Sequence, residues 1–278
     1  MRLVTYGTSG QRVGALDAEG RVRALEFGGS MLDLIRAGGA LPAPGGVVEG
    51  ARILAPIPRP AKNIFCVGKN YHEHAKEFAG SGFDATAKEV VPEFPVVFSK
   101  PPTCVIGPGE PIPAHLDPTG SVDYEGELAV VIGRAGRGIA RGDALRHVFG
   151  YTIVNDVTAR TLQHRHRQWI LGKGLDGFAP MGPAILTADE VPDPGSLRLT
   201  THVNGERRQD APVADLIFDI PALIEAISAG ITLEPGDIIA TGTPAGVGIG
   251  FTPPRFLARG DVVRVEVTGI GVLENPVG

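Results

Sequence analysis

The sequence DYEGELAVVI, residues 123–132, joins three acidic residues to a run of apolar ones. Alternate side chains of a β-strand point to the same face, so a continuous strand here would carry Asp123, Glu125 and Glu127 on one face. Like charges held together beside a protein core are unfavourable unless a cation neutralises them. The stretch predicts a site for a hard divalent cation such as Mg²⁺, or, as the plainer alternative, a solvated strand face.

A further carboxylate follows a second apolar run. Asp156 lies in VNDVTAR, residues 154–160, where a strand pattern changes to a helical one, and we expect a helix from Asp156 through Gln163. Taken by itself, this position is explained most simply by a helix N-cap.

A histidine and a glutamate lie three residues apart in the segment VGKNYHEHAKE, residues 67–77. On a helix beginning after Tyr71, His74 and Glu77 would share a face, so that the carboxylate could orient the imidazole as a general base. The spacing alone is equally typical of a surface helix with mixed charges.

Short apolar or β-branched runs bounded by Gly, Pro or Asp dominate the chain beyond residue 60 and predict a strand-rich α+β fold with short peripheral helices. The expected strands are 63–67, 95–99, 128–132, 150–154, 197–203, 237–240 and 261–267. Besides the helices after Tyr71 and at 156–163, helices are expected at about 143–148 and 221–229. The 39 Gly and 24 Pro also favour short strands and tight turns over a helix bundle.

Residues 1–58 are predicted to form a small strand-rich N-terminal module, with strands at 2–7, 11–17 and 21–27 and a helix capped by Ser30 that ends at Arg36. The sequence IPRP, residues 57–60, stiffens the chain after it, because proline restricts both itself and the preceding residue. The second predicted domain is 60–278.

Composition excludes several classes of function. The 26 Lys and Arg against 31 Asp and Glu give a net charge of −5, which argues against a surface that binds nucleic acid. No apolar run approaches the roughly 18 residues of a membrane helix, and the N-terminus lacks the apolar region of a signal peptide, so we expect a cytoplasmic protein with no membrane partner. Cys66 and Cys104 form no CxxC motif and are expected to be reduced thiols.

Six separated blocks, in order, resemble the fumarylacetoacetate hydrolase family. They cover the chain from about residue 60 to its end, and because six blocks agree the resemblance is specific. The blocks are Val67-Gly68-Lys69-Asn70-Tyr71, Phe98-Ser99-Lys100-Pro101, Asp123-Tyr124-Glu125-Gly126-Glu127, Asn155-Asp156-Val157-Thr158-Ala159-Arg160, Gly172-Lys173-Gly174-Leu175-Asp176 and Thr241-Gly242-Thr243-Pro244.

The resemblance implies a mixed β-roll or sandwich core, a Mg²⁺ or Mn²⁺ ion, a homodimer and a small 2-oxo acid substrate. By position, it implies that the metal ligands are Glu125, Glu127 and Asp156. It implies His74 as the base, with Glu77 as its partner on a lid over residues 71–95, and Lys173 as a further catalytic residue. The implied substrate contacts are Arg160, Gln163 and Thr243.

One departure from the family pattern bears on the substrate. Animal fumarylacetoacetate hydrolases have a fourth carboxylate ligand seven residues before the base histidine, where this chain has Val67. The chain thus resembles the shorter bacterial and mitochondrial branch.

The implied reaction is cleavage of a C–C bond in a 2-oxo or β-diketo acid through an enolate held by the metal, as in acylpyruvate hydrolysis or oxaloacetate decarboxylation. Two alternatives remain open. One is an isomerase or decarboxylase of the 2-hydroxyhepta-2,4-diene-1,7-dioate type, and the other is a metabolite-binding protein without catalysis.

Overall fold

A mixed sheet of twelve strands runs through the part of the chain that the computed structural model describes, residues 1–7, 10–83 and 90–278. Along its main path the order is β4 (Pro44–Val47), β3 (Val22–Leu25), β2 (Gln11–Leu16), β1 (Arg2–Gly7), β13 (Ala179–Thr187), β11 (Val148–Asn155), β10 (Gly126–Ile132), β16 (Ile238–Ala240), β6 (Ile64–Gly68) and β7 (Val96–Lys100). Off this path, β5 (Arg52–Leu54) pairs with β1 and β8 (Val105–Ile106) pairs with β13. Most neighbours are antiparallel, whereas β16 and β6, and β13 and β8, are parallel.

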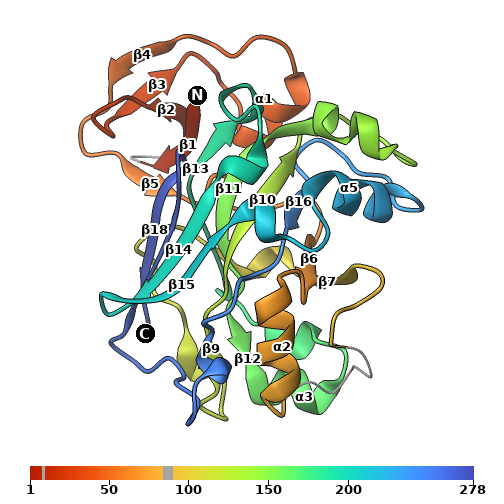
Figure 1. The fold of residues 1–278 in the computed structure, drawn as a ribbon. Helices are drawn as coiled ribbons and strands as arrows, with labels where there is room; N and C mark the ends of the chain where they lie inside the picture. The colour runs from red at the N-terminus through yellow and green to blue at the C-terminus, as the bar shows by residue number, and fades with distance from the viewer. Residues whose placement is uncertain (8–9, 84–89) are drawn as a thin grey trace.

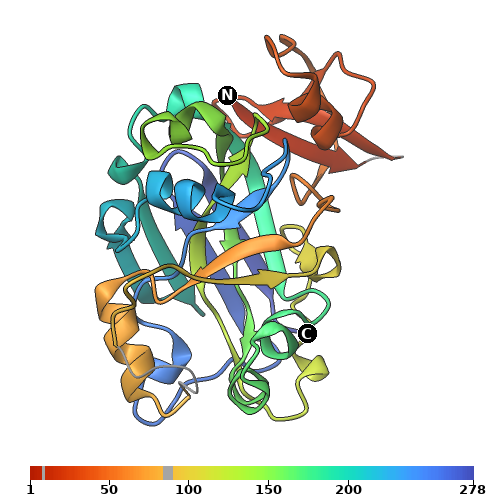
Figure 2. The ribbon, with the colours of Figure 1, turned by 90° about the vertical axis from the view of Figure 1, so that its right-hand side faces the viewer.

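A second, antiparallel sheet packs against this one (Figures 1 and 2). Its order is β15 (Glu206–Pro212), β14 (Arg198–Val203), β17 (Val262–Val267) and β18 (Gly271–Pro276). A two-stranded pair, β9 (Val122–Asp123) with β12 (Thr158–Ala159), lies near one end of the molecule. The strand-rich α+β architecture predicted from the sequence is confirmed.

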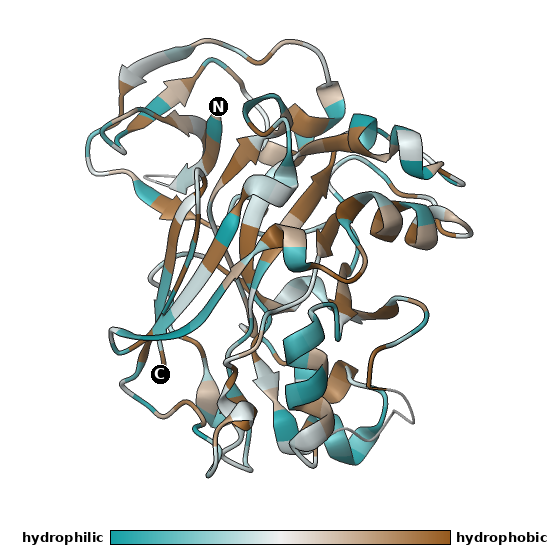
Figure 3. Cartoon of the chain, viewed as in Figure 1, coloured by the Kyte–Doolittle hydropathy of each residue, from teal (hydrophilic) through white to brown (hydrophobic). Residues whose placement is uncertain are grey.

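The alternation of side chains along β10 divides the core in two. Leu128 and Val130 point into a cluster shared with the second sheet, while Ala129 and Val131 point into a cluster on the opposite face of the large sheet. The central strands are accordingly the most apolar part of the ribbon in Figure 3. Because both faces are covered, β10 is buried along its whole length, from Gly126 to Ile132.

Helices are few and short. They are α1 (Met31–Ala37), α2 (His72–Gly80), α3 (Arg160–His166), α4 (Ile170–Lys173) and α5 (Ile220–Ser228). Ser30 caps α1 as predicted, while the predicted helix near 143–148 is a 3-10 helix, Arg141–His147. No helix among the described residues is long and apolar enough to cross a bilayer.

The helix expected from Asp156 begins four residues later, at Arg160. Thr158 and Ala159 instead pair with Asp123 and Val122, so extended backbone separates Asp156 from α3. The N-cap interpretation of Asp156 is therefore wrong, and its side chain is available for other contacts.

The strand expected to run without a break from Asp123 to Ile132 is also wrong. Residues 122–123 pair with β12, residues 124 and 125 belong to no strand, and β10 starts at Gly126. This break frees the Asp123 side chain from the alternation of β10.

The N-terminal strands are continuous with the rest of the fold. In β1, Arg2 and Leu3 pair with Leu186 and Ile185 of β13, and Leu3 shares a hydrophobic cluster with Val131 of β10. Whether residues 1–58 act as a domain stays a prediction.

Candidate active site

Three buried carboxylates meet where β10 begins and β11 ends. Because Gly126 pairs with Asn155 in antiparallel register, the residues around them, Glu125, Glu127 and Asp156, are brought side by side. Each offers one oxygen, and these oxygens all lie within 4.8 Å of one another. Asn155 holds the corner by accepting the backbone N–H of Glu125 at 3.0 Å.

Asp123 lies outside this group. Its carboxylate accepts the backbone N–H groups of Gly248 at 2.7 Å and Ile249 at 3.1 Å, and the Nε–H of Arg160 at 2.9 Å. Of the three acidic residues in the stretch 123–132, Glu125 and Glu127 belong to the carboxylate group. Asp123 instead binds Arg160 and the backbone of Gly248 and Ile249.

Three buried cations form ion pairs with Glu125 and Asp156 in the described part of the chain. Lys173 Nζ lies 2.7 Å from both Glu125 Oε2 and Asp156 Oδ2, and Arg160 Nη1 lies 2.6 Å from Glu125 Oε1. Lys100 Nζ contacts the other oxygen of Asp156, Oδ1, at 2.6 Å. In the described part of the chain, Glu127 has no ion pair, and its printed donor is the backbone N–H of Gly242 at 2.9 Å.

The two glutamates therefore titrate differently. Burial by itself raises the pKa of Glu125, but Lys173 and Arg160 outweigh burial and bring that pKa to about 2. Burial raises the pKa of Glu127 well above its usual value, and the nearby charges of Asp156 and Glu125 raise it further. Glu127 is thus the carboxylate whose charge is least compensated.

The donor set fits a hard divalent cation. Glu125, Glu127 and Asp156 each offer a buried carboxylate oxygen, and Glu127 makes no ion pair among the described residues. Oxygen ligands of this kind suit Mg²⁺ or Mn²⁺, which keep other positions for water or substrate. The residues that could hold the ion are Glu125, Glu127 and Asp156.

His74 and Glu77 lie on the inner face of α2. His74 Nδ1 is 3.0 Å from Glu77 Oε2, and Gly246 donates its backbone N–H to Glu77 Oε1, also at 3.0 Å. His74 is only 4% exposed, so the alternative of a mixed-charge surface helix does not apply to this face. Glu77 fits because residue 250 is glycine: a Cβ there would lie 1.7 Å from Glu77 Oε1.

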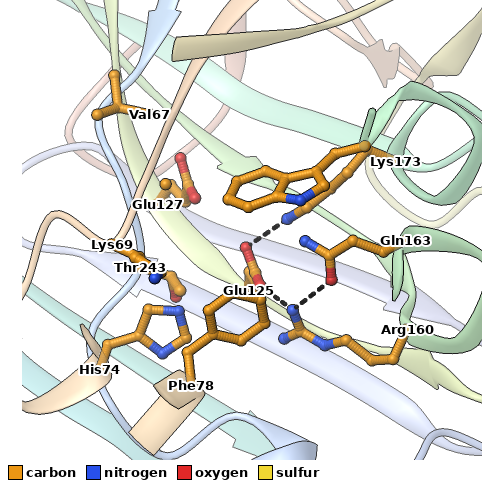
Figure 4. Close-up of a pocket in the computed structure, with 12 residues that line it drawn as sticks. Val67, Lys69, His74, Phe78, Glu125, Glu127, Arg160, Gln163, Lys173 and Thr243 are labelled. Carbon is orange, nitrogen blue, oxygen red and sulfur yellow. Dashed lines mark hydrogen bonds and ion pairs between the residues drawn. The ribbon is translucent and has the colours of Figure 1, made fainter. Parts of the chain in front are cut away.

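One pocket is lined by His74, Glu125 and Glu127 (Figure 4). The carboxylates of Glu125 and Glu127 lie between His74 on one side and the side chains of Arg160, Gln163 and Lys173 on the other. Phe78 and Trp169 pack edge to face, with ring centroids 6.0 Å apart, and form an apolar wall.

The structure brings seven of the nine predicted site residues to this pocket. Asp156 joins them through the carboxylate group, and Glu77 through its contact with His74. Their catalytic and binding roles stay predictions. The Thr243 hydroxyl is already engaged, since it donates to the Gly126 carbonyl and accepts from Gln209 Nε2. Part of the predicted lid over 71–95 falls on residues 84–89, outside the described residues.

Two site residues carried no assigned role in the sequence analysis. Lys100 contacts Asp156, and Lys69 lines the cavity with its Nζ 5.5 Å from the centre of the Phe78 ring. Lys69 has φ of 55°, a backbone conformation that is uncommon outside glycine. Lys69 and Lys100 both belong to sequence blocks quoted above, but no residue near either of them in sequence indicates what its side chain contacts.

Comparison with known proteins identifies related sequences. Residues 63–278 match the family model described as fumarylacetoacetate hydrolase C-terminal. The chain is similar to oxaloacetate tautomerase YisK of Bacillus subtilis (strain 168), with 53% identity over 227 residues that cover 82% of this chain and 73% of that protein.

Solved structures resemble the whole chain. A fumarylacetoacetate hydrolase from psychrophilic Exiguobacterium antarcticum has a TM-score of 0.88 and 42% identity, covering 100% of this chain and 99% of that one. A maleylpyruvate hydrolase from Sphingobium sp. SYK-6, in complex with manganese(II) and pyruvate, has a TM-score of 0.76 and 30% identity over 100% of this chain and 98% of its own.

Proposed function

The chain belongs to the fumarylacetoacetate hydrolase family, and from that premise we propose that it is a divalent-metal-dependent enzyme acting on oxaloacetate. The reaction proposed is keto–enol interconversion, with C–C cleavage of the same or related 2-oxo acids as a second outcome at the same site. The observation that carries the proposal is that His74, which is paired with Glu77, lines the same pocket as Glu125 and Glu127.

Glu125, Glu127 and Asp156 would hold the metal, with one oxygen from each. A bound Mg²⁺ or Mn²⁺ ion supplies Lewis-acid polarisation of the 2-oxo group of the substrate. The similarity to a maleylpyruvate hydrolase in complex with manganese(II) and pyruvate supports a site of this kind.

His74 is proposed to move the proton. When Nδ1–H is donated to Glu77, Nε2 carries the lone pair, and Glu77 stabilises the imidazolium that forms when Nε2 takes a proton. In oxaloacetate this proton leaves C3, and its return to the oxygen or to the carbon gives the enol or the keto form. A positioned base of this kind accounts for about 10²- to 10⁴-fold in rate.

The cationic side of the cavity is proposed to bind a substrate carboxylate. Arg160 Nη2 is buried and has no hydrogen-bond partner among the described residues, so one guanidinium nitrogen remains available. Gln163 lies beside it, with its Oε1 3.4 Å from Arg160 Nη1. Lys173 adds positive charge where negative charge develops on the enolising substrate.

Cleavage is a second candidate because the same residues can perform it. With an acylpyruvate, His74 Nε2 would take a proton from water, and the resulting hydroxide would add to the distal carbonyl. The adduct would then break its C–C bond to give a carboxylic acid and the enolate of pyruvate, whose carbon takes back the proton held by His74. With oxaloacetate, loss of CO₂ from the β-carboxylate needs no water. The isomerase of larger dienedioates stays an alternative, because the chain is similar, at 38% identity, to a 2-hydroxyhepta-2,4-diene-1,7-dioate isomerase from Mycobacterium marinum.

The decisive experiment follows enol-oxaloacetate by ultraviolet absorbance with purified protein, Mn²⁺ and an EDTA-treated control. We expect faster loss of the enol band with metal and a return to the uncatalysed rate with EDTA. Parallel assays of pyruvate and CO₂ over oxaloacetate and a short acylpyruvate series separate interconversion from cleavage. A protein that binds Mn²⁺ but accelerates none of these reactions would overturn the proposal and favour the non-catalytic alternative.

A further inference from the structure

Lys100 is a fully buried lysine that the proposed mechanism does not use. It ends β7, its exposure is 0%, and it is not among the residues that line the cavity. A lysine ammonium so deeply buried is costly unless it is fully hydrogen-bonded.

All three protons of the Lys100 ammonium are committed. Its Nζ donates to Asp156 Oδ1 at 2.6 Å, to the Val157 carbonyl at 2.9 Å and to the Lys173 carbonyl. An ammonium has three donors, so none is left for a substrate. The role of Lys100 therefore acts through its partners.

These contacts fix Asp156 in one orientation. With Oδ1 held by Lys100, Oδ2 is the oxygen that faces Lys173 Nζ, 2.7 Å away, together with Glu125 Oε2. The bond to Lys100 therefore fixes the plane of the Asp156 carboxylate and leaves one of its oxygens facing the carboxylate group.

The same ammonium also holds the backbone of Lys173, the last residue of α4. Lys173 is then tied to Asp156 twice, through its side chain directly and through its carbonyl by way of Lys100. A displacement of Lys100 would move a metal ligand and a catalytic lysine together.

We propose that Lys100 is a positioning residue that orients Asp156 for metal binding and fixes Lys173 against the same carboxylate. The inference rests on the proposed metal site, because its first consequence is a change in metal affinity. Groups that orient metal ligands in this way typically alter affinity by about 10- to 100-fold when removed.

Two possible roles of Lys100, supplying charge and orienting Asp156, predict opposite changes in metal affinity when Lys100 is replaced. If Lys100 contributed only charge, its removal would leave the carboxylate group more negative and tighten the binding of a cation. If it orients Asp156, its removal weakens binding. Lys100→Met removes the charge at similar volume, and Lys100→Arg keeps the charge but changes the placement of the donors.

The control is Lys62→Met. Lys62 Nζ also bonds a buried aspartate, Asp237, at 2.9 Å and a backbone carbonyl, that of Thr232, at 2.9 Å. These contacts lie where β6 and β16 begin, whereas Gly68 at the end of β6 lines the cavity. Lys62→Met tests the loss of a structural lysine without a change at the site.

The measurement is the Mn²⁺ dissociation constant by electron paramagnetic resonance without substrate, with folding checked by near-ultraviolet circular dichroism. We expect Lys100→Met and Lys100→Arg to raise the dissociation constant about 10- to 100-fold and Lys62→Met to leave it unchanged. Where Lys100→Met does not fold, Lys100→Arg decides. Unchanged or tighter binding in a folded Lys100 variant would overturn the inference, as would failure of both variants to fold at saturating Mn²⁺. Absence of Mn²⁺ binding by the wild-type protein would instead overturn the proposed function.

Discussion

Glu125 and Glu127 are two residues apart and buried in one group, yet their surroundings differ. Glu125 has Lys173 and Arg160 as cationic partners, whereas Glu127 has the backbone N–H of Gly242. The negative charge that a metal would neutralise is therefore concentrated at Glu127, and the same substitution should act differently at the two positions.

We expect Glu127→Gln to weaken Mn²⁺ binding by more than about 100-fold and to leave the melting temperature of the metal-free protein unchanged or higher. The reason is that Gln resembles the protonated carboxyl, the form favoured by the raised pKa of Glu127. Glu125→Gln should weaken binding too but also destabilise the metal-free protein by about 1–3 kcal/mol, because Lys173 and Arg160 each lose one of their two carboxylate partners. Metal titration and thermal melting test both; equal effects on the metal-free protein would contradict the difference.

His74→Ala separates proton transfer from metal binding. We expect turnover of oxaloacetate to fall about 10²- to 10⁴-fold while the Mn²⁺ dissociation constant stays within twofold of wild type. His164→Ala is the control, because His164 is exposed and bonds the Phe83 carbonyl away from the carboxylates. Loss of metal binding in His74→Ala would show that His74 serves the metal site instead.

The sequence could predict which acids come together but not which cations hold them. Glu125, Glu127 and Asp156 stand at the ends of recognisable apolar runs, and the family resemblance implies them as a set. Lys100 lies 56 residues from Asp156 in sequence, so no local spacing reveals their contact. The strand pattern puts Asp123 on one face with Glu125 and Glu127, because the break in the strand at residues 124–125 has no sequence signal.

At the scale of elements, α2 and the loop around residues 246–250 form one unit. The loop donates the Gly246 N–H to Glu77 and the Gly248 and Ile249 N–H groups to Asp123. Asp123 in turn holds Arg160, which contacts Glu125. The loop therefore connects the proposed base with the proposed carboxylate-binding arginine.

Gly250→Ala tests this unit. The added Cβ would lie 1.7 Å from Glu77 Oε1, so the Glu77 carboxylate must move away from Gly246 and His74. We expect a fall in kcat of about tenfold or more with unchanged Mn²⁺ affinity. Gly80→Ala, at the end of α2 with no atom within 4 Å of the added Cβ, should leave kcat unchanged. A Gly250→Ala enzyme with wild-type kcat would show that the position of Glu77 does not limit the rate.

Strand prediction failed where proline or polar residues interrupt the pattern. β13 was missed because Pro180 and Pro183 lie within it and Pro is rare in central strands, yet it joins β1 to β11. β15, with the sequence ERRQDAP, was missed because its face toward solvent is strongly polar. Its buried positions, Gln209 and Ala211, give little apolar alternation to detect.

For the molecule as a whole, the proposed metal site would link stability to pH. The raised pKa of Glu127 means that its contribution to the stability of the metal-free fold is present at low pH and is lost as pH rises through that raised pKa. A bound cation removes this loss, so stabilisation by metal should grow as pH rises.

We expect one fixed Mn²⁺ concentration, about 100 times the dissociation constant at pH 8, to raise the melting temperature by roughly 5–10 °C at pH 8, and by less at pH 5.5. Thermal melts with Mn²⁺ and with EDTA at the two pH values measure the difference. Glu127→Gln is the control and should show little metal-dependent shift at either pH. A larger shift at pH 5.5 than at pH 8 would contradict the assignment.

Residues 1–58 should be required for a soluble fold. Their removal would uncover the edge of β13 and the apolar residues that Met31, Ile35 and Ile57 cover. We expect a chain beginning at residue 60 to aggregate on expression, as measured by the soluble fraction and size-exclusion chromatography. A monodisperse truncated protein would support an independent catalytic domain, and light scattering of the full chain tests the proposed homodimer.

The hydrogen bond from the Gly242 N–H to Glu127 can form only late in synthesis of the chain on the ribosome. Once Lys173 has left the ribosome, the acidic ligands and all three buried cations have been synthesised, but β16 and Gly242 lie about 70 residues further on. At about 5–20 residues per second, several seconds pass before Glu127 gains its donor and β10 its second neighbour. The nascent chain thus contains every predicted ligand before β16 and Gly242 can order them. We therefore expect tight metal binding only after the polypeptide is released.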